Sequence, residues 1–319
     1  RTAVPLDKRK RDKVISQVCR VIRENKTFFL SGHLKPDGDT LASEMAMASL
    51  LKRLGKKADI YNYEPVSSQY DFLPGINKVK HAHKLERHFD AAFIFECGEP
   101  ARMGNIIDLK KQAGIVVNVD HHLKNSFFGD INWVNPASSS NAEQLFYLFE
   151  KMRMPITRDE ATCLYTGVLT DTGRFHHSNT NPETMHIAGQ LLQRGINANY
   201  LCERLYSTRS HSALKLLGLC LSKMEFTPDR KVSMVKISVN DFKSVKSSED
   251  ETEEIVNYGL QVPETLISIF ARQTEQNGVV KVSLRSRRGV NVCELAEKFG
   301  GWGHKYASGC KLPGTLDSA

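Results

Sequence analysis

The chain has 319 residues, 40% of them hydrophobic and 25% charged, which is typical of a globular protein too long for one small core and favours two domains. Its 44 basic and 36 acidic side chains give a formal charge of +8, a surplus that is compatible with an anionic ligand without indicating a particular one. The seven cysteines are scattered and include no C-x-x-C pair, which argues against a disulfide framework and a zinc finger. No apolar run is long enough to span a bilayer, and the first residues lack the apolar core of a signal peptide. We therefore predict a cytoplasmic protein without a membrane partner.

Strands and helices alternate along the first two thirds of the chain. Apolar, β-branched runs predict buried strands at residues 27–30, 58–61, 91–95 and 115–120, and helical spacing predicts helices at 11–24, 41–54, 142–149 and 161–168. We expect Asp39 or Thr40 to cap the second helix, and Ser140-Asn141-Ala142-Glu143 resembles a capping box ahead of the third. Alternating strands and helices are typical of a parallel sheet, so the fold class is α/β.

The pattern changes after residue 196. Residues 197–221 show helical spacing, and then strands are predicted at 231–237, 265–271 and 279–284, with an acidic run at 249–254 and a last helix at 292–299. We therefore divide the chain into a parallel-sheet domain at 1–196, a helical connector at 197–224 and a smaller mixed α/β domain at 225–319.

Polar side chains follow several predicted strands of the first domain. The strand at 115–120 runs directly into Asp120-His121-His122. Because ligands bind at the carboxyl ends of parallel strands, groups that follow neighbouring strands can share one site. Further candidates are His33, Asp37, Asp39, Glu96 and Asp171. Carboxylates with some imidazole suit Mn²⁺ or Mg²⁺, and the set is large enough for two metals, between which a bridging water would lose a proton and attack a phosphoryl group.

These motifs resemble those of the DHH phosphoesterases. The four N-terminal motifs of that family are similar to the His33–Asp39 loop, Phe95-Glu96-Cys97-Gly98, Asp120-His121-His122 and Thr170-Asp171-Thr172-Gly173. Ser283-Leu284-Arg285-Ser286 and Gly300-Gly301-Trp302-Gly303-His304 resemble the DHH-associated C-terminal domain. The resemblance covers nearly the whole chain and is closest to the short nanoRNases and pAp phosphatases.

The resemblance implies a role for each matching residue. One metal would be held by His33 and Asp37, the other by Asp39, His121 and Asp171, and both by Glu96. Asp120 would orient the site, and His122 would contact the scissile phosphate or protonate the leaving oxygen. The substrate-binding candidates are Arg174, Arg285, Ser286, Gly301, Gly303 and His304.

The implied activity is hydrolysis of very short oligonucleotides (nanoRNA and linear dinucleotides) and of pAp to mononucleotides by a two-metal hydroxide mechanism, with Mn²⁺ preferred and Mg²⁺ as the alternative. The partner is then a short oligonucleotide or dinucleotide substrate, and the common occurrence of dimers among relatives leaves a homodimer open. Glu96 stands where the family usually has Asp, and Trp302 interrupts a glycine run. Two alternatives remain. One, within the same enzyme class, is a cyclic dinucleotide phosphodiesterase, and the other, suggested only by Glu96, is a catalytically weak nucleotide-binding sensor.

Overall fold

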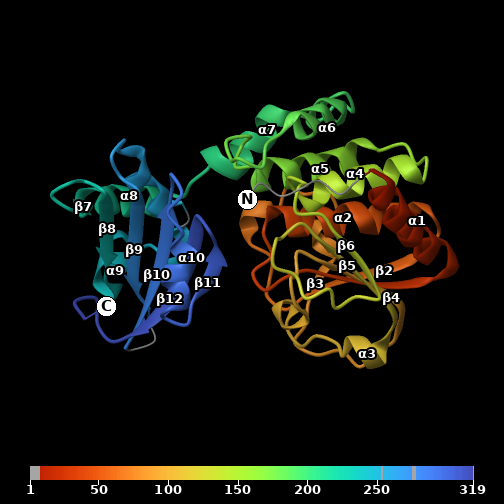
Figure 1. Cartoon of the computed structure of the whole chain (residues 1–319), viewed down its shortest axis with the longest axis horizontal. Coiled ribbons are helices and arrows are strands. Elements are labelled where there is room, and N and C mark those ends of the chain that lie inside the picture. Colours follow the sequence, from red (N-terminus) through yellow and green to blue (C-terminus); the bar gives the residue numbers. More distant parts are fainter. Residues whose placement is uncertain (1–7, 253, 275–277, 319) are drawn as a thin grey trace. The chain divides into compact units, whose positions relative to one another are not determined.

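The computed structural model describes residues 8–252, 254–274 and 278–318, except for the side chain of His304. The chain folds into two compact units (Figure 1), of which the first ends at Ser207 and the second begins at Thr208. Among the described residues, no helix combines the length and the apolar character needed to cross a membrane.

The first unit is built on a parallel sheet. All neighbouring strands are parallel, in the order β3-β2-β1-β4-β5-β6. The strands are β1 (Thr27–Ser31), β2 (Lys57–Asn62), β3 (Val79–His81), β4 (Phe89–Phe95), β5 (Ala113–Asp120) and β6 (Ile131–Val134). The predicted parallel sheet and its four longer strands are confirmed. The short edge strands β3 and β6 were not predicted.

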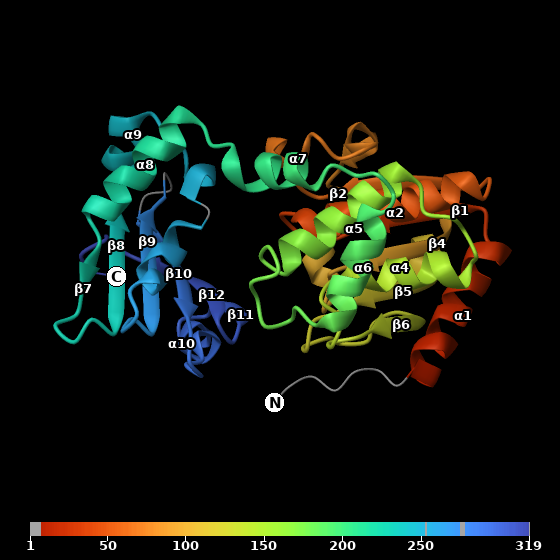
Figure 2. The ribbon, with the colours of Figure 1, turned by 90° about the horizontal axis from the view of Figure 1, so that it is seen from above.

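Helices cover one face of this sheet (Figure 2), where Phe28, Leu30, Phe93 and Phe95 enter the main core. The opposite face packs against the segment between β4 and β5, which contributes Met103 and other apolar residues. The helices are α1 (Lys8–Glu24), α2 (Gly38–Arg53), α3 (Leu109–Gln112), α4 (Asn141–Lys151), α5 (Arg158–Asp171), α6 (Pro182–Leu192) and α7 (Ala198–Cys202), with short 3₁₀ or π helices at Ser68–Tyr70, Ile76–Lys78, Pro100–Met103 and Glu203–Ser207.

The first turns of α2 and α4 differ from the expectation. The cap of α2 is Asp37, whose carboxylate accepts a hydrogen bond from the Thr40 backbone at 3.0 Å, so the prediction of Asp39 or Thr40 as the cap was wrong. Ser140 caps α4 as expected, because its hydroxyl oxygen accepts from the Glu143 backbone at 3.0 Å. The Glu143 carboxylate, however, binds groups outside the cap instead of completing a capping box.

The second unit is a mixed sheet in the order β11-β12-β10-β9-β8-β7, in which the β8–β9 pair is parallel and the others are antiparallel. Its strands are β7 (Glu225–Phe226), β8 (Val232–Ile237), β9 (Ile267–Gln273), β10 (Val279–Ser286), β11 (Trp302–His304) and β12 (Ala307–Pro313), and its helices are α8 (His211–Ser222), α9 (Val239–Val245), α10 (Val292–Glu297) and the 3₁₀ helices Glu249–Thr252 and Ile255–Gln261. Burial alternates along β8 and β10, as strands with one face on a core require. The predicted mixed α/β domain is confirmed.

Candidate metal centre

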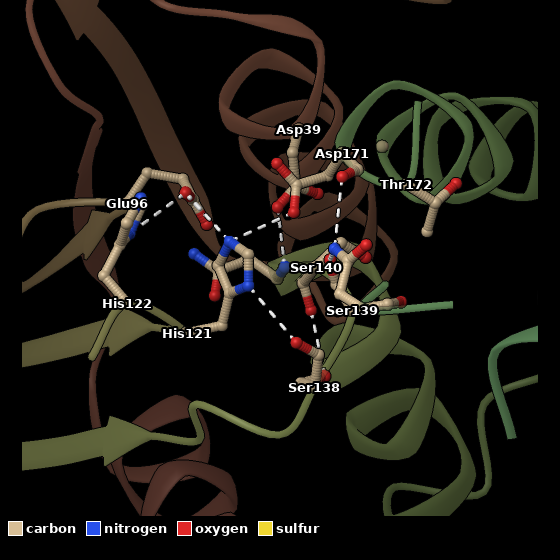
Figure 3. Close-up of polar contacts among 12 residues, drawn as sticks. Asp39, Glu96, His121, His122, Ser138, Ser139, Ser140, Asp171 and Thr172 are labelled. Atoms are coloured by element: carbon tan, nitrogen blue, oxygen red, sulfur yellow. Dashed lines mark hydrogen bonds and ion pairs between the residues drawn. The ribbon is translucent and has the colours of Figure 1, made fainter. Parts of the chain in front are cut away.

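The centre lies at the carboxyl ends of β1, β4 and β5, which are neighbours in the sheet. Glu96 follows β4 directly, and His121 follows the last residue of β5. Asp171 comes from elsewhere, as the last residue of α5, and Asp39 lies in the first turn of α2. Figure 3 shows the side chains of Asp39, Glu96, His121 and Asp171 directed toward one place.

His121 stands between two carboxylates. Its Nε2 atom lies 3.3 Å from Oε2 of Glu96 and 3.3 Å from Oδ2 of Asp171. Its Nδ1 atom lies 3.2 Å from the carbonyl oxygen of Ser138. Because a carbonyl only accepts, Nδ1 carries a proton, and Nε2 is the ring atom that faces the two acids. A neutral imidazole in this position presents a lone pair where a metal ligand is needed.

Asp39 is held by the start of another helix. Its two carboxylate oxygens accept hydrogen bonds from the backbone N–H groups of Asn141 at 2.6 Å and Ala142 at 3.0 Å. These are the first residues of α4, where unpaired N–H groups and the helix dipole favour a negative charge. The acid is buried, and α5 approaches it closely at Gly167.

Asp120 and His122 form a separate hydrogen-bonded pair. His122 Nδ1 donates to Oδ1 of Asp120 at 2.7 Å, and Asn125 donates to Oδ2 at 2.6 Å. Burial alone would raise the pKa of the Asp120 carboxyl, but these hydrogen bonds and the neighbouring imidazoles lower it. The carboxylate therefore fixes the orientation of the His122 ring and leaves Nε2 as its other polar atom.

Glu96 adopts a backbone conformation that is unusual for a residue with a side chain. Its φ of 58° lies in the left-handed region, which costs roughly 1 kcal/mol or more outside glycine. The side chain is buried, Oε2 lies 3.5 Å from Nδ1 of His122, and Oε1 has no hydrogen-bond partner within the described residues. Such strain is often found at functional sites.

His33 and Asp37 form a second pair, in which Nε2 of His33 lies 3.4 Å from Oδ2 of Asp37. Nδ1 of His33 lies 2.6 Å from the Leu34 carbonyl oxygen, so this ring also directs Nε2 toward a carboxylate. The loop that carries it is tied to the segment after β4, because the Leu34 backbone N–H donates to the Arg102 carbonyl at 2.6 Å.

The electrostatics of the centre favour a bound cation. Burial raises the pKa of Glu96 well above its usual value, raises that of Asp39, and raises that of Asp171 to about 7, although the His121 charge opposes each shift. Burial lowers the pKa of His121, but Glu96 and Asp171 outweigh that effect and raise it well above its usual value. Positive charge is thus needed among these acids. In the described part of the chain, buried Glu96 Oε1 and His121 Nε2 lack hydrogen-bond partners, and the oxygen and imidazole donors fit divalent cations.

The predicted substrate-binding residues have varied surroundings. The Arg174 guanidinium lies over the Tyr206 ring, 4.3 Å from its centroid, while Arg285 is half-buried on β10 and Ser286 is buried and donates to the Val290 carbonyl at 2.7 Å. The side chain of His304 lies outside the described part of the structure.

Gly301 and Gly303 have a structural reason to be glycine. A Cβ at Gly301 would lie 2.3 Å from the Gly309 carbonyl oxygen, and one at Gly303, whose φ is 152°, would lie 2.5 Å from that of Ala307. Close packing of β11 on β12 therefore requires both glycines, whether or not they also contact substrate.

Sequence reasoning missed several residues around the centre. Asn125, which donates to Asp120, belongs to an irregular loop with no recognisable spacing. Glu143 was interpreted only as part of a helix start, because S-x-x-E is a local pattern, and Ser138 was not singled out, because its partner His121 comes from another element.

Comparisons with known proteins agree with this geometry. Residues 27–168 match the model of the DHH family, N-terminal domain, and residues 235–319 match the DHHA1 domain. The chain is 30% identical over 310 residues to the bifunctional oligoribonuclease and PAP phosphatase NrnA of Thermus thermophilus, covering 96% of this chain and 90% of that protein. It is 24% identical to the protein of the same name from Bacillus subtilis, covering 93% of each.

Among solved structures, an exopolyphosphatase-related protein from Bacteroides fragilis superposes with a TM-score of 0.90 at 26% identity, covering 96% of this chain and 93% of that one. Sequence similarity over nearly the full length, both domain matches and the fold all agree. The chain therefore belongs to the DHH family.

Proposed function

We propose that the protein is a metal-dependent phosphoesterase that hydrolyses very short oligonucleotides, and pAp, to mononucleotides. The observation that carries the proposal is the position of His121, with Nε2 3.3 Å from carboxylate oxygens of both Glu96 and Asp171, in a chain of the DHH family. Support for the substrate class comes from relatives named as oligoribonuclease and PAP phosphatase that match over most of their length.

The residues divide between metal binding and proton transfer. His33 and Asp37 would hold one divalent cation, Asp39, His121 and Asp171 a second, and Glu96 both, with Mn²⁺ the metal we propose and Mg²⁺ the alternative. Bound there, such a pair supplies water activation and neutralisation of phosphate charge.

His122 is the residue placed to handle a proton. Asp120 accepts from its Nδ1 at 2.7 Å, so the ring can contact the scissile phosphate through Nε2 or donate a proton from that atom to the leaving oxygen. The hydrogen bonds that Asp120 accepts lower the pKa of its carboxyl, so it remains an acceptor for Nδ1 of His122.

We further propose that residues 1–196 carry the chemistry and that 197–224, which span the boundary between the two units at Ser207, connect them. Residues 225–319 would contribute Arg285, Ser286, Gly301, Gly303 and His304 to substrate binding, with Arg174 contributed by the first domain. All seven cysteines lie in the described part of the chain and none forms a disulfide there, which fits the reducing cytoplasm where we place the protein. A homodimer is the oligomeric state to test first.

The proposed substrate preference is tested by chain length. With added Mn²⁺, we expect the hydrolysis rate to be highest on pApA and to fall for chains of five and fifteen nucleotides. Equal rates at all three lengths would contradict the preference for short substrates.

A second panel separates the alternatives, using pAp, pGpG and cyclic di-AMP as substrates. Turnover of cyclic di-AMP ahead of the linear compounds would indicate a cyclic dinucleotide phosphodiesterase. Binding without hydrolysis, with hydrolysis restored by Glu96→Asp, would indicate a nucleotide sensor.

A further inference from the structure

A buried carboxylate lies behind the metal centre. Glu143, on α4, is only 4% exposed. Its Oε1 accepts from the Ser138 hydroxyl at 2.9 Å, and its Oε2 accepts from the Ser139 hydroxyl at 2.6 Å, the Thr184 hydroxyl at 3.0 Å and the Ser139 backbone at 3.3 Å. All four partners donate, so this side chain acts as an acceptor that gathers groups from two segments of the chain.

Two of the residues that donate to Glu143, Ser138 and Ser139, lie next to Ser140 in a segment that we call the serine turn, defined as residues 138–140. The turn contacts the metal centre directly (Figure 3), because the Ser138 carbonyl accepts from Nδ1 of His121 at 3.2 Å. The Ser139 carbonyl accepts from the Asn179 side chain at 2.9 Å, and the same amide donates to the Asp171 backbone carbonyl at 3.1 Å. The serine turn is thus linked to two of the candidate ligands.

The end of the serine turn also holds Asp39, another candidate ligand. Ser140 caps α4, and the next two backbone N–H groups are those that bind Asp39. Since the Ser140 hydroxyl already caps the Glu143 backbone N–H, the helix start does not need the Glu143 carboxylate. The hydrogen bonds of that carboxylate instead set the path of the turn.

We propose that Glu143 is a positioning residue for the metal centre, holding the serine turn so that the Ser138 carbonyl keeps the proton of His121 on Nδ1 and Nε2 stays directed toward Glu96 and Asp171. The inference rests on the proposed function only in that the centre binds divalent cations. Outer groups that orient a ligating imidazole typically change metal affinity by about 10- to 100-fold.

The test compares variants on one helix. Glu143→Ala removes both carboxylate oxygens, whereas Glu143→Gln keeps one amide oxygen that can still accept from Ser139 and Thr184. Glu150→Gln is the matched control, because Glu150 is exposed on the same helix. Mn²⁺ binding to the metal-stripped full chain is measured by titration calorimetry. ¹⁵N NMR of the chain loaded with Mg²⁺, which is diamagnetic and replaces the second proton of the ring, reports whether His121 keeps its remaining proton on Nδ1.

We expect Glu143→Ala to weaken Mn²⁺ binding by about 10- to 100-fold and to disturb the Nδ1-protonated form of His121. Glu143→Gln should lie close to the wild type, and Glu150→Gln should match it. If Glu143→Ala does not fold, Ser138→Ala decides the question, because it deletes one donor to Glu143 while keeping the backbone carbonyl, and it should weaken Mn²⁺ binding several-fold.

A purely structural role gives a different result. Glu143→Ala, or Ser138→Ala in its place, would then lower the melting temperature while leaving the Mn²⁺ affinity and the His121 spectrum of the folded protein unchanged, which would overturn the inference. Failure of the proposed function is recognised separately, as wild-type protein that binds Mn²⁺ and hydrolyses none of the nucleotides.

Discussion

The Nε2 atom of His121 and the Oδ2 atom of Asp171 lie 3.3 Å apart, which joins the carboxyl end of β5 to the last residue of α5. The His121 Nε2 atom is buried, and the carboxylate it faces is crowded by other acids, so this contact needs added positive charge. In the metal-free protein that charge is a proton, and we propose that divalent cations replace it.

Replacing Asp171 with Asn removes the charge with little change in size. Altering a group that only orients a metal ligand typically costs up to about 100-fold in activity. Because this substitution removes a direct ligand, we expect the rate of pApA hydrolysis to fall by more than that. The side chain is a quarter exposed at a helix end, so the fold should remain. The steady-state rate and the melting temperature are measured together, and activity within a few-fold of wild type would mean that Asp171 is not a ligand.

The closeness of α5 to Asp39 is tested by adding one methyl group. A Cβ at Gly167 would lie 2.5 Å from Oδ1 of Asp39 and 2.6 Å from Cβ of Ala142. Gly167→Ala should therefore reduce the free energy of unfolding by about 1–3 kcal/mol, the usual cost of overpacking, and should weaken Mn²⁺ binding.

The control for Gly167→Ala is Gly218→Ala in α8, where the added Cβ would meet nothing within 4 Å. That change should raise the free energy of unfolding by up to about 1 kcal/mol, because alanine favours a helix over glycine. Urea unfolding measures both variants. Equal effects of the two substitutions would show that α5 does not press on Asp39.

Glu44 predicts a pH dependence of stability. Burial raises the pKa of this carboxyl to about 8, even though Asn62 donates to it at 2.9 Å and favours the charged form. A raised folded-state pKa means that the folded state binds a proton that the unfolded state releases. The contribution of the protonated Glu44 to the free energy of unfolding is therefore complete below about pH 4.5 and is lost as the pH rises through 8.

Glu44→Gln should remove that dependence. With EDTA present, the variant should be more stable than wild type by roughly 4 kcal/mol at pH 8, and the two should converge near pH 4.5. Unfolding by urea across this range checks the sign. A difference that grows toward low pH would show that Glu44 is ionised in the folded protein.

Much of the fold could be predicted because its elements carry strong local patterns. Phe93 and Val117 lie in apolar runs long enough to identify central strands, and alternation with helices indicated the parallel sheet. The strand Ile131–Val134 has four residues after a polar loop, too few for its pattern to stand out.

The sequence indicated which residues belong to the candidate site, but it did not indicate which contacts they make. Asp37 and Asp39 are equally suited to cap a helix by local sequence, and only the contact of Asp39 with α4 assigns the cap to Asp37. Glu143 fits a capping box locally, whereas its hydroxyl partner Thr184 comes from α6. Such choices depend on tertiary contacts, which a one-dimensional pattern does not contain.

The most direct test is hydrolysis of pApA by one metal-stripped preparation, followed first in EDTA and then after addition of excess Mn²⁺, with His121→Ala assayed in parallel. We predict no turnover in EDTA, rapid turnover once Mn²⁺ is in excess, and none at any stage for the variant. Turnover that continues in EDTA, or a His121→Ala protein that matches the wild-type rate, would contradict a metal-dependent reaction at this centre.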